Sequence, residues 1–386
     1  MNIFFIARGW PSDREPQWGS FERDQALAMQ KLGHQVVVLS VDARFRKYHR
    51  KYGITKEVHG NIPHYNIFAG SFWGKPLRSI SMRLHIKMKQ ILLLHLFKKA
   101  IAQEGMPDLV YGHYLGGCSM ALAIKLKYGI PAVGIEHWSM LGFSNIKKSV
   151  RDEAARTYPN LDCQMSVSIA LKDNIRRNIG VDTIVVNNMV GTEFHYEPKT
   201  KNLDKVCFVT TGNLLPVKGF DNLINAFGKL NLPPDTWTLN IIGGGKERDN
   251  LQKLVDSVGL GENIHLCGSK NREGVIDMLH NSDVYVMSSR SETFGVAAIE
   301  ALACGMPVIA TECGGAADFM NKDNGVTCPV DDVDRLANCI RYMMSHYQEY
   351  NRAQIATDCQ KKFSSEAIGK QLEGIFEEVI KKSKQK

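Results

Sequence analysis

The sequence lacks the cysteine patterns that hold small folds together. Its nine cysteines are an odd number, and they are scattered singly with no Cys-x-x-Cys pair. This distribution argues against a disulfide framework and against a structural zinc site, and it fits a reducing cytoplasm. The chain also shows no tandem repeat and no low-complexity tract.

A long apolar run is also missing from the N-terminus. The run in MNIFFIARGWPS is too short for a signal or membrane-spanning segment, and a basic residue follows it rather than precedes it. We therefore expect a cytoplasmic protein that begins with a buried strand. The segment IFFIARGWPSDREP lacks the glycine fingerprint of dinucleotide-binding oxidoreductases, which excludes that class.

Length and charge bound the organisation of the chain. At 386 residues, 44% of them apolar, the chain is long enough for two domains with a core in each. Residues 41–110 contain thirteen Lys/Arg and four Asp/Glu, an excess of nine, whereas the formal net charge of the whole chain is +8. The remainder of the chain is therefore close to neutral.

The basic stretch at residues 72–100 mixes aromatic and aliphatic residues with lysines and arginines. A basic amphipathic helix of this kind can lie on an anionic membrane, at the inner face of the plasma membrane. It can equally pack its apolar side on a sheet and leave its charges in water. No nucleic-acid recognition motif accompanies the stretch, so we expect no nucleic-acid partner.

Strand-like and helix-like segments alternate along the chain, which predicts an α/β fold with parallel sheets covered by helices. One helix is expected from Ser20 to Leu32, ending at Gly33. A polar, aperiodic stretch near residues 188–204 predicts a hinge. The expected strands are NIFFIA, HQVVVLS, DLVYGHY, PAVGIEH, QMSVS and TIVVNN before the hinge, and VCFVTTG, TWTLNIIGGG, NIHLCG, DVYVMSS and PVIAT after it.

Two glutamates in SETFGVAAIEALACGMPVIATECGGAADF are the most informative feature. Glu292 should lie on a loop and Glu300 in a helix over residues 296–304. A helix beginning near Gly295 would offer unpaired N–H groups and the positive end of its dipole to a phosphate. The glycine pair 314–315 gives a second turn close to a ligand. A carboxylate, a helix end and a glycine turn together suit a sugar nucleotide.

The second half of the chain resembles the donor domain of glycosyltransferase family 4, of the glycosyl transferases group 1 type. The first half is compatible with that family along nearly its full length. The resemblance implies the GT-B fold, with two Rossmann-like domains whose parallel sheets face each other across a cleft. It implies an acceptor-side domain over residues 1–190, a donor-binding domain over 204–360, and a C-terminal helix over 361–386 packing back towards the first domain. The matching features are TGNLLPVKGFDNLINAF, LNIIGGGKERDNLQKL, NIHLCGSK, the paired glutamates, and the glycine pair with NGVTCPVDD.

The resemblance implies roles for residues of the second half. Lys218 resembles the lysine that grips the diphosphate, whose negative charge grows as the glycosidic bond breaks. Asn213 stands where many members carry an arginine, and it can donate hydrogen bonds but supplies no charge. Glu292 would face the donor sugar and Glu300 would accept hydrogen bonds from the ribose, although a capping acid and a solvated helix face are the alternatives. The remaining residues expected at the donor are Gly19, Gly268, Thr293, Phe294, Gly295 and Val296.

In the first half, Gly19 follows the loop RGWPSDREPQW, where the family brings a glycine close to the diphosphate or the acceptor. Trp10 and Trp18 in this loop would suit the sugar faces of an acceptor, or they could simply pack the loop. His137 resembles the family histidine near the donor sugar, and His113 is a candidate on the acceptor side. Each histidine could instead be a satisfied polar residue at a strand end.

The activity implied by the resemblance is retaining transfer of a hexosyl group from a UDP- or GDP-sugar to a hydroxyl. The acceptor would be a glycan or a lipid-linked precursor in surface polysaccharide biosynthesis. Front-face attack, with the leaving phosphate oxygen helping to take the proton, requires no protein base, and neither a metal nor a cofactor is demanded. Two alternatives stay open, a nucleotide-sugar epimerase of the same fold and a non-catalytic sugar-nucleotide-binding protein.

Overall fold

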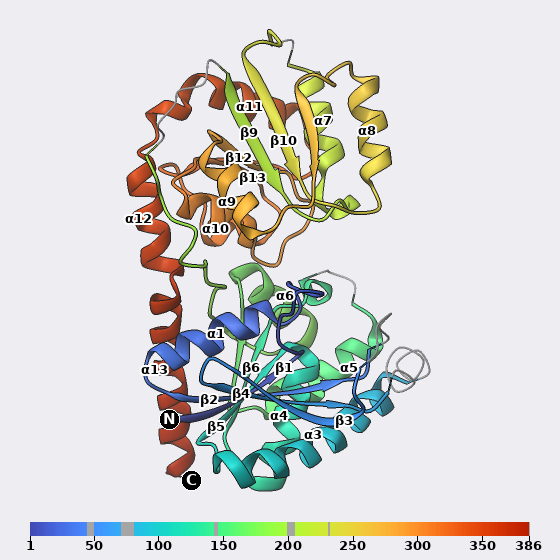
Figure 1. Cartoon of the computed structure of the whole chain (residues 1–386), viewed down its shortest axis with the longest axis vertical. Helices are drawn as coiled ribbons and strands as arrows, with labels where there is room; N and C mark the ends of the chain where they lie inside the picture. The colour runs from blue at the N-terminus through green and yellow to red at the C-terminus, as the bar shows by residue number, and fades with distance from the viewer. Residues whose placement is uncertain (45–49, 71–80, 143–145, 199–204, 231, 386) are drawn as a thin grey trace. The chain divides into compact units, whose positions relative to one another are not determined.

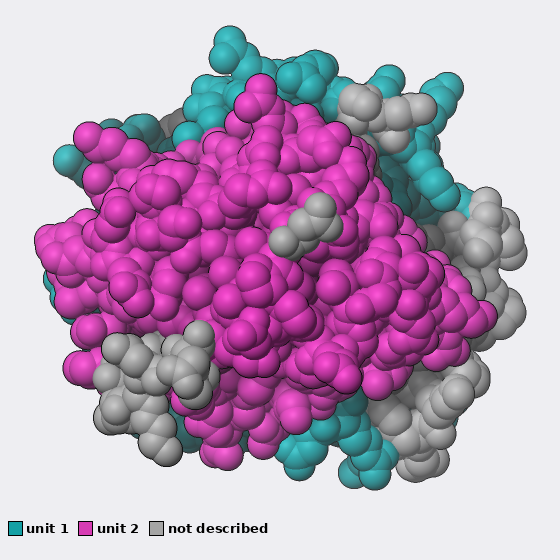
Figure 2. Space-filling model, turned by 90° about the horizontal axis from the view of Figure 1, so that it is seen from above, with its two compact units in different colours: residues 1–189, 365–386 teal, residues 190–364 magenta. Residues whose placement is uncertain are grey.

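The computed structural model describes residues 1–44, 50–70, 81–142, 146–198, 205–230 and 232–385. The chain forms two compact units, coloured separately in Figure 2. Unit 1 comprises Met1–Met189 and Ser365–Lys386, and unit 2 comprises Val190–Ser364. Each unit contains a sheet of its own with helices packed on it (Figure 1). This confirms the expected α/β class.

The sheet of unit 1 has the strand order β3-β4-β2-β1-β5-β6-β7-β8. Its neighbouring strands are parallel except for β3 and β4, which form an antiparallel hairpin. Apolar runs such as Ile3–Ile6 place the inner strands in the core. The strands are β1 Asn2–Ala7, β2 Gln35–Asp42, β3 Gly53–His59, β4 Ile62–Phe68, β5 Leu109–His113, β6 Ala132–Glu136, β7 Cys163–Ser166 and β8 Ile184–Val185.

The hairpin of β3 and β4 was not expected from the sequence. β3 is an edge strand whose residues are exposed or half-buried, so it carries no apolar alternation to reveal it. The turn at Gly60 and Asn61 joins the two strands, and the positive φ of Gly60, 63°, suits a tight hairpin turn. Strand prediction failed for β3 because an edge strand buries little.

The helices of unit 1 include α13, which comes from the far end of the chain. The C-terminal segment expected as one helix is divided, because α12 of unit 2 ends at Phe363 and α13 begins at Ser365. α13 packs on α1 (Figure 1). The ring of Phe376 in α13 lies 5.0 Å from the ring of Tyr111. The helices are α1 Ser20–Lys31, α3 Met82–Glu104, α4 Tyr114–Tyr128, α5 Lys148–Thr157, α6 Ile169–Ile179 and α13 Ser365–Lys384.

Helix α3 contains most of the basic stretch, and residues 71–80 lie outside the described residues. Its apolar residues do not form one face: Leu93 and Phe97 are buried, whereas Leu84 and Ile91 are exposed. The buried residues pack against α4, β2 and β4. Among the described residues, no helix has the length and apolar content that crossing a membrane requires.

The sheet of unit 2 has the order β11-β10-β9-β12-β13-β14, and its strands are all parallel. β14 was not expected from the sequence. The helices lie on both faces of the sheet around a core that includes Phe208, Trp237 and Ile309. The elements are β9 Val206–Thr211, α7 Phe220–Gly228, β10 Trp237–Ile242, α8 Arg248–Ser257, β11 Ile264–Gly268, α9 Arg272–His280, β12 Val284–Met287, α10 Val296–Ala303, β13 Val308–Thr311, β14 Gly325–Cys328, α11 Val333–His346 and α12 Arg352–Phe363.

Candidate active site

The strand order of unit 2 reverses between β9 and β12. From β9 the chain proceeds to β10 and β11 on one side, and β12 leads to β13 and β14 on the other. In open α/β sheets, ligands bind at the carboxyl ends of the strands at such a reversal. The loop after β9 carries Lys218, and the loop after β12 carries Glu292. The topology thus brings both predicted residues to the expected ligand edge.

Lys218 and Glu292 form an ion pair in this position. Lys218 Nζ donates to Glu292 Oε1 over 2.5 Å, and their side chains are 25% and 15% exposed. The hydroxyl of Ser289 donates to the same carboxylate oxygen over 2.8 Å. An ammonium group held beside a half-buried carboxylate can shift to a more highly charged anion that enters the site. Ser289, a neighbour of Glu292 that the sequence analysis did not name, completes the cluster.

The two loops are held together by backbone contacts that require glycine. Gly219 follows Lys218 with a φ of 63°, and a Cβ added there would lie 2.1 Å from Ser288 O. Ser288 Oγ donates to Lys218 O over 3.0 Å, and Arg290 N donates to Val217 O over 2.8 Å. Because the loops touch through backbone atoms, the position of Lys218 is fixed relative to Glu292.

Arg290 joins these loops to the rest of unit 2. Its guanidinium forms ion pairs with Asp221 at 2.8 Å and with Asp331 at 2.6 Å. Hydrogen bonding to Asp221, and then to Asp331, raises the pKa of Arg290 above its usual value. Sequence reasoning missed Arg290, although its position two residues before Glu292 was available as a signal.

Glu300 lies in α10, the helix that follows Glu292, and its charge acts on Tyr285 of β12. The hydroxyl of Tyr285 lies 3.2 Å from Thr211 Oγ1. Burial raises the pKa of Tyr285 to about 12, and the charges of Glu300 and Glu292 add to this rise. The charges of both predicted carboxylates therefore act on one buried tyrosine of β12.

The start of α10 follows the prediction closely. Gly295 is the N-cap with a φ of 102°, and Val296 is the first helical residue. A Cβ at Gly295 would lie 3.1 Å from Met287 Sδ. Phe294 is buried and its ring lies 5.7 Å from that of Phe319, while Thr293 is half-buried in the loop. The start of α10 therefore lies directly after a loop that an aromatic contact holds in place.

Other predicted donor residues lie on the neighbouring loops. Asn213 is exposed two residues after β9, and Gly268 ends β11 with a φ of 69°. The glycine run that begins at Gly243 has a structural reason, since a Cβ at that residue would lie 1.8 Å from Gly212 O. This close packing explains the run without a ligand.

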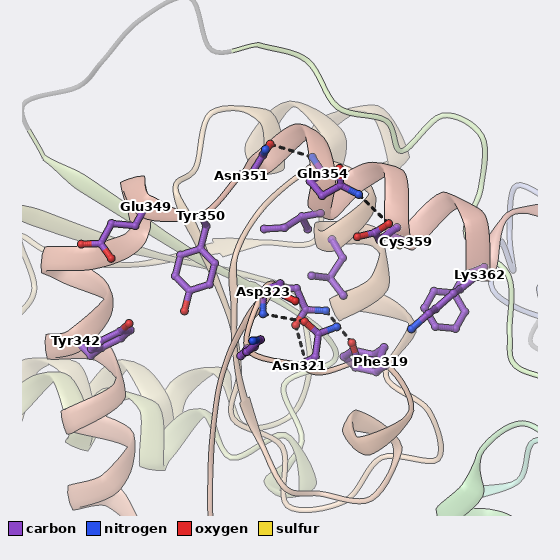
Figure 3. A pocket seen from close by; sticks show the side chains of 16 residues that line it. Phe319, Asn321, Asp323, Tyr342, Glu349, Tyr350, Asn351, Gln354, Cys359 and Lys362 are labelled. Atoms are coloured by element: carbon purple, nitrogen blue, oxygen red, sulfur yellow. Dashed lines mark hydrogen bonds between the residues drawn. The ribbon is translucent and has the colours of Figure 1, made fainter.

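A different pocket of unit 2, of about 410 Å³, is shown in Figure 3. Tyr342, Tyr350 and Gln354 line it from the α11 and α12 region, and Asp323 lines it from the loop before β14. Lys218, Glu292 and Glu300 are not among its lining residues. The pocket is thus separate from the predicted donor site.

The strand order of unit 1 also reverses, between β1 and β5. Gly19 precedes α1 in the loop after β1, with a φ of 82°, and a Cβ there would lie 2.2 Å from Gly9 O. Arg8 forms a bidentate pair with the buried Glu22, at 2.8 and 3.2 Å. Burial acts to raise the pKa of Glu22, yet the hydrogen bonds from Arg8 lower it to about 2. Position 19 requires glycine both because of its positive φ and because Gly9 leaves no room for a Cβ.

The two predicted histidines of unit 1 lie together in its interior. His113 Nδ1 and His137 Nε2 are 3.3 Å apart, and His137 Nδ1 is 3.1 Å from Asn188 Oδ1. Burial lowers the pKa of His113 to about 4 and that of His137 to about 3. Burial raises the pKa of the adjacent Glu136 to about 7, although hydrogen bonds to its carboxylate, first that from Tyr158, act to lower this pKa. Both ring nitrogens of His137 are already bonded within unit 1.

Trp10 and Trp18 border a cavity of about 620 Å³ in unit 1, and His113 is not among its lining residues. Trp18 Nε1 donates to Arg8 O, and the guanidinium of Arg44 lies 3.3 Å from the centroid of the Trp18 ring. Trp10 stacks on His59. The two tryptophans are thus brought together at one cavity, while His113 lies apart from it.

Two family models match the chain in sequence. One, described as Glycosyltransferase Family 4, matches residues 23–194, and the other, described as Glycosyl transferases group 1, matches residues 192–358. Together they span the chain from residue 23 to residue 358.

Curated proteins and solved structures agree with these matches. A putative teichuronic acid biosynthesis glycosyltransferase of Bacillus subtilis, TuaC, is 25% identical over 99% of this chain and 100% of its own length. An uncharacterized glycosyltransferase of Methanocaldococcus jannaschii is 29% identical over 73% of this chain and 78% of its own. Sucrose-phosphate synthase from Thermosynechococcus elongatus superposes with a TM-score of 0.78, at 17% identity over 98% of this chain and 99% of that one.

A further structure gives the same fold with a nucleotide bound. Anabaena Alr3699/HepE in complex with UDP superposes with a TM-score of 0.71, at 17% identity over 98% of this chain and 100% of that one. The predicted GT-B fold is confirmed by these superpositions. The chain is a glycosyltransferase of the group 1 and family 4 type.

Proposed function

We propose that this protein transfers a hexosyl group, with retention of configuration, from a UDP- or GDP-sugar to a hydroxyl of a surface-glycan precursor. The observation that carries the proposal is the Lys218–Glu292 pair at the strand-order reversal of unit 2. The acceptor class is supported by TuaC, named for teichuronic acid biosynthesis, and by the lipopolysaccharide outer core galactosyltransferase WaaB, which superposes with a TM-score of 0.72 at 18% identity.

In this proposal the positive groups serve the leaving diphosphate. As the bond between the anomeric carbon and the phosphate oxygen breaks, Lys218 and the N–H groups at the start of α10 neutralise the charge that develops there. The acceptor oxygen bonds the anomeric carbon on the face that the phosphate leaves, and its proton passes to the departing phosphate oxygen. Glu292 would bond a sugar hydroxyl and Glu300 the ribose. No protein base, metal or cofactor enters these steps.

Residues of unit 1 would contribute to binding the acceptor and the donor sugar. Gly19 would allow the loop after β1 to fold back closely on Gly9, and we propose that this tight loop brings backbone atoms near a phosphate or an acceptor. Trp10 and Trp18 would stack on acceptor sugars in their cavity. His137 would reach a donor sugar with a ring nitrogen only by giving up its bond to His113 or Asn188. We therefore propose for His137 a role in holding the carboxyl end of β6 in shape.

The basic helix α3 is proposed to hold the protein at an anionic inner membrane surface. Its exposed Ile91 and Leu84, 61% and 50% exposed, lie on the same helix as the exposed Lys87 and Lys98. Apolar side chains that enter the headgroup region beside lysines are typical of interfacial helices. A helix that packs on the sheet with one side can still present these residues.

Turnover with a panel of UDP- and GDP-sugars and hydroxyl acceptors tests the proposal. We expect one donor to be consumed only with acceptor, and Lys218→Ala to reduce kcat by a factor of ten or more with folding intact. Lys229→Ala is the matched control, because Lys229 is paired with Asp334 on the surface of the same unit. Isomerisation of the donor without acceptor would indicate an epimerase, and saturable binding without turnover would indicate a non-catalytic protein.

A further inference from the structure

The hairpin of β3 and β4 carries three side chains of the kind that bind metals. Glu57, His59 and His64 each offer one ligand atom, and these atoms lie within 4.8 Å of one another. Glu57 pairs directly opposite His64 in the antiparallel register, and His59 follows Glu57 by two residues. Residues two apart on a strand, and residues directly opposite on its neighbour, share one face of the sheet. All three side chains therefore stand on the same face.

The hydrogen bonds behind His64 fix which of its ring nitrogens is free. His64 Nε2 lies 2.8 Å from Ser40 Oγ, and the Ser40 hydroxyl donates to Asn66 Oδ1 over 2.8 Å. A hydroxyl has only one hydrogen, so Ser40 must accept the hydrogen of His64 Nε2. The lone pair is then on Nδ1. This atom is enclosed, has no hydrogen-bond partner, and belongs to a side chain that is 6% exposed.

His59 presents a second enclosed nitrogen in the same cluster. Its Nε2 has no hydrogen-bond partner and lies 3.4 Å from Glu57 Oε2. Its ring is stacked on Trp10 with centroids 4.5 Å apart and planes inclined by 1°. Enclosed polar atoms without hydrogen-bond partners are uncommon in proteins, and an ion is one explanation for such a group. Here the two histidines that carry them lie in one cluster with a carboxylate.

We propose that Glu57, His59 and His64 bind a divalent transition-metal ion, and that Zn²⁺ fits the ligand set best. Two imidazole nitrogens and one carboxylate oxygen are common Zn²⁺ ligands, at bond lengths of about 2.0–2.2 Å. The ligand atoms must then move to within about 3.4 Å of one another. The side chain of Glu57, 65% exposed, can make that movement. Ser40 would act as the outer partner that orients a ligating histidine.

The site would hold one wall of a cavity in place. The three ligands and Trp10 are among the residues that line the cavity of about 620 Å³ in unit 1. An ion on His59 would fix the ring on which Trp10 stacks. The site shares no residue with the Lys218–Glu292 pair of unit 2, so it is independent of the proposal that sugar transfer needs no metal.

Zn²⁺ titration by calorimetry tests this inference on the tag-free, full-length protein after chelation and removal of the chelator. We expect one ion per chain, with affinity reduced at least 10-fold in His59→Asn and in Glu57→Gln. Because Glu57 is exposed, Glu57→Gln should leave folding intact, which circular dichroism checks. His95→Asn, a change at an exposed histidine of α3, is the matched control and should bind like the wild type.

Two further readouts locate the ion. Zn²⁺ should change the tryptophan fluorescence of the wild type, and Trp10→Phe should remove that change while keeping the affinity within about 3-fold. Co²⁺ should give a spectrum without a thiolate charge-transfer band, because none of the proposed ligands is a cysteine. Absence of saturable binding, unchanged affinity in His59→Asn and Glu57→Gln, or a thiolate band that places the ion on cysteine would each overturn the proposal.

Discussion

Replacing either partner of the Lys218–Glu292 pair should change nucleoside diphosphate binding in opposite directions. In the described structure Lys218 Nζ bonds Glu292 Oε1 over 2.5 Å. A bound diphosphate would compete with Glu292 for the same ammonium group. Removing Lys218 takes away the attraction, whereas neutralising Glu292 takes away the competitor.

The expected magnitudes follow from this competition. A hydrogen bond to a charged group contributes about 1.5–3 kcal/mol, and a partly exposed ion pair contributes about 0.5–1 kcal/mol. After subtraction, Lys218→Ala should weaken binding by about 0.5–2.5 kcal/mol, or roughly 2- to 70-fold in Kd. Glu292→Gln should strengthen it by about 0.5–1 kcal/mol, or roughly 2- to 5-fold, while kcat falls. The glutamine keeps the oxygen that accepts from Ser289.

Calorimetric titration with UDP and with GDP measures both effects without knowledge of the sugar. Lys229→Ala, which breaks an exposed ion pair in the same unit, should leave both affinities unchanged. Thermal unfolding of each variant reports whether the loops are intact. If both substitutions weakened binding equally, the pair would merely hold the two loops together, and the proposed role of Lys218 at the diphosphate would be wrong.

Three further predictions address other parts of the chain. Glu300→Gln should raise the Kd for UDP or GDP about 10-fold and leave inorganic pyrophosphate binding unchanged, because the ribose alone would lose a partner; equal weakening of both ligands contradicts the ribose role. Lys87→Glu with Lys89→Glu should abolish flotation with anionic vesicles, at about 1 kcal/mol per lysine, and equal flotation would leave α3 as a solvated helix. The neutral histidines His113 and His137, whose pKa values fall to about 4 and 3, should make unfolding pH-dependent. Their stabilising contribution is complete above the unfolded pKa of about 6.5 and is lost as pH falls, since only the unfolded chain binds the protons. When the pH falls from 6.5 to 4.5, the free energy of unfolding of His113→Asn, measured with urea, should decrease by about 2–3 kcal/mol less than that of the wild type. Equal decreases in the two proteins would refute the assignment.

Local sequence was sufficient for most elements of both units. The strands β9, β10, β12 and β13 were recognised because each is a short, largely apolar and largely buried run bounded by glycine or polar residues. The start of α10 at Val296 was also placed correctly, since Gly295 in a positive-φ conformation directly precedes it. Signals of this kind depend only on neighbouring residues, so no tertiary information was needed.

Neither the hairpin β3–β4 nor the cluster of Glu57, His59 and His64 could be predicted from such local signals. Glu57 and His64 are seven positions apart with no fixed spacing that denotes a metal site, and they meet only through the antiparallel register. Ser40 comes from a third strand, β2, that pairs with β4. Ser289, which donates to Glu292, was missed for a related reason, because a serine after a strand resembles any other loop residue in the sequence.

The sequence alone determined the fold class, the family and the residue types at the ligand edge, because periodicity, glycine positions and motif order are local properties of the chain. Only the tertiary structure decided which strands are neighbours. Lys218 and Glu292 are 74 residues apart, and they meet because β9 lies beside β12. That adjacency arises from burying the apolar faces of the whole sheet together, which no segment can specify alone.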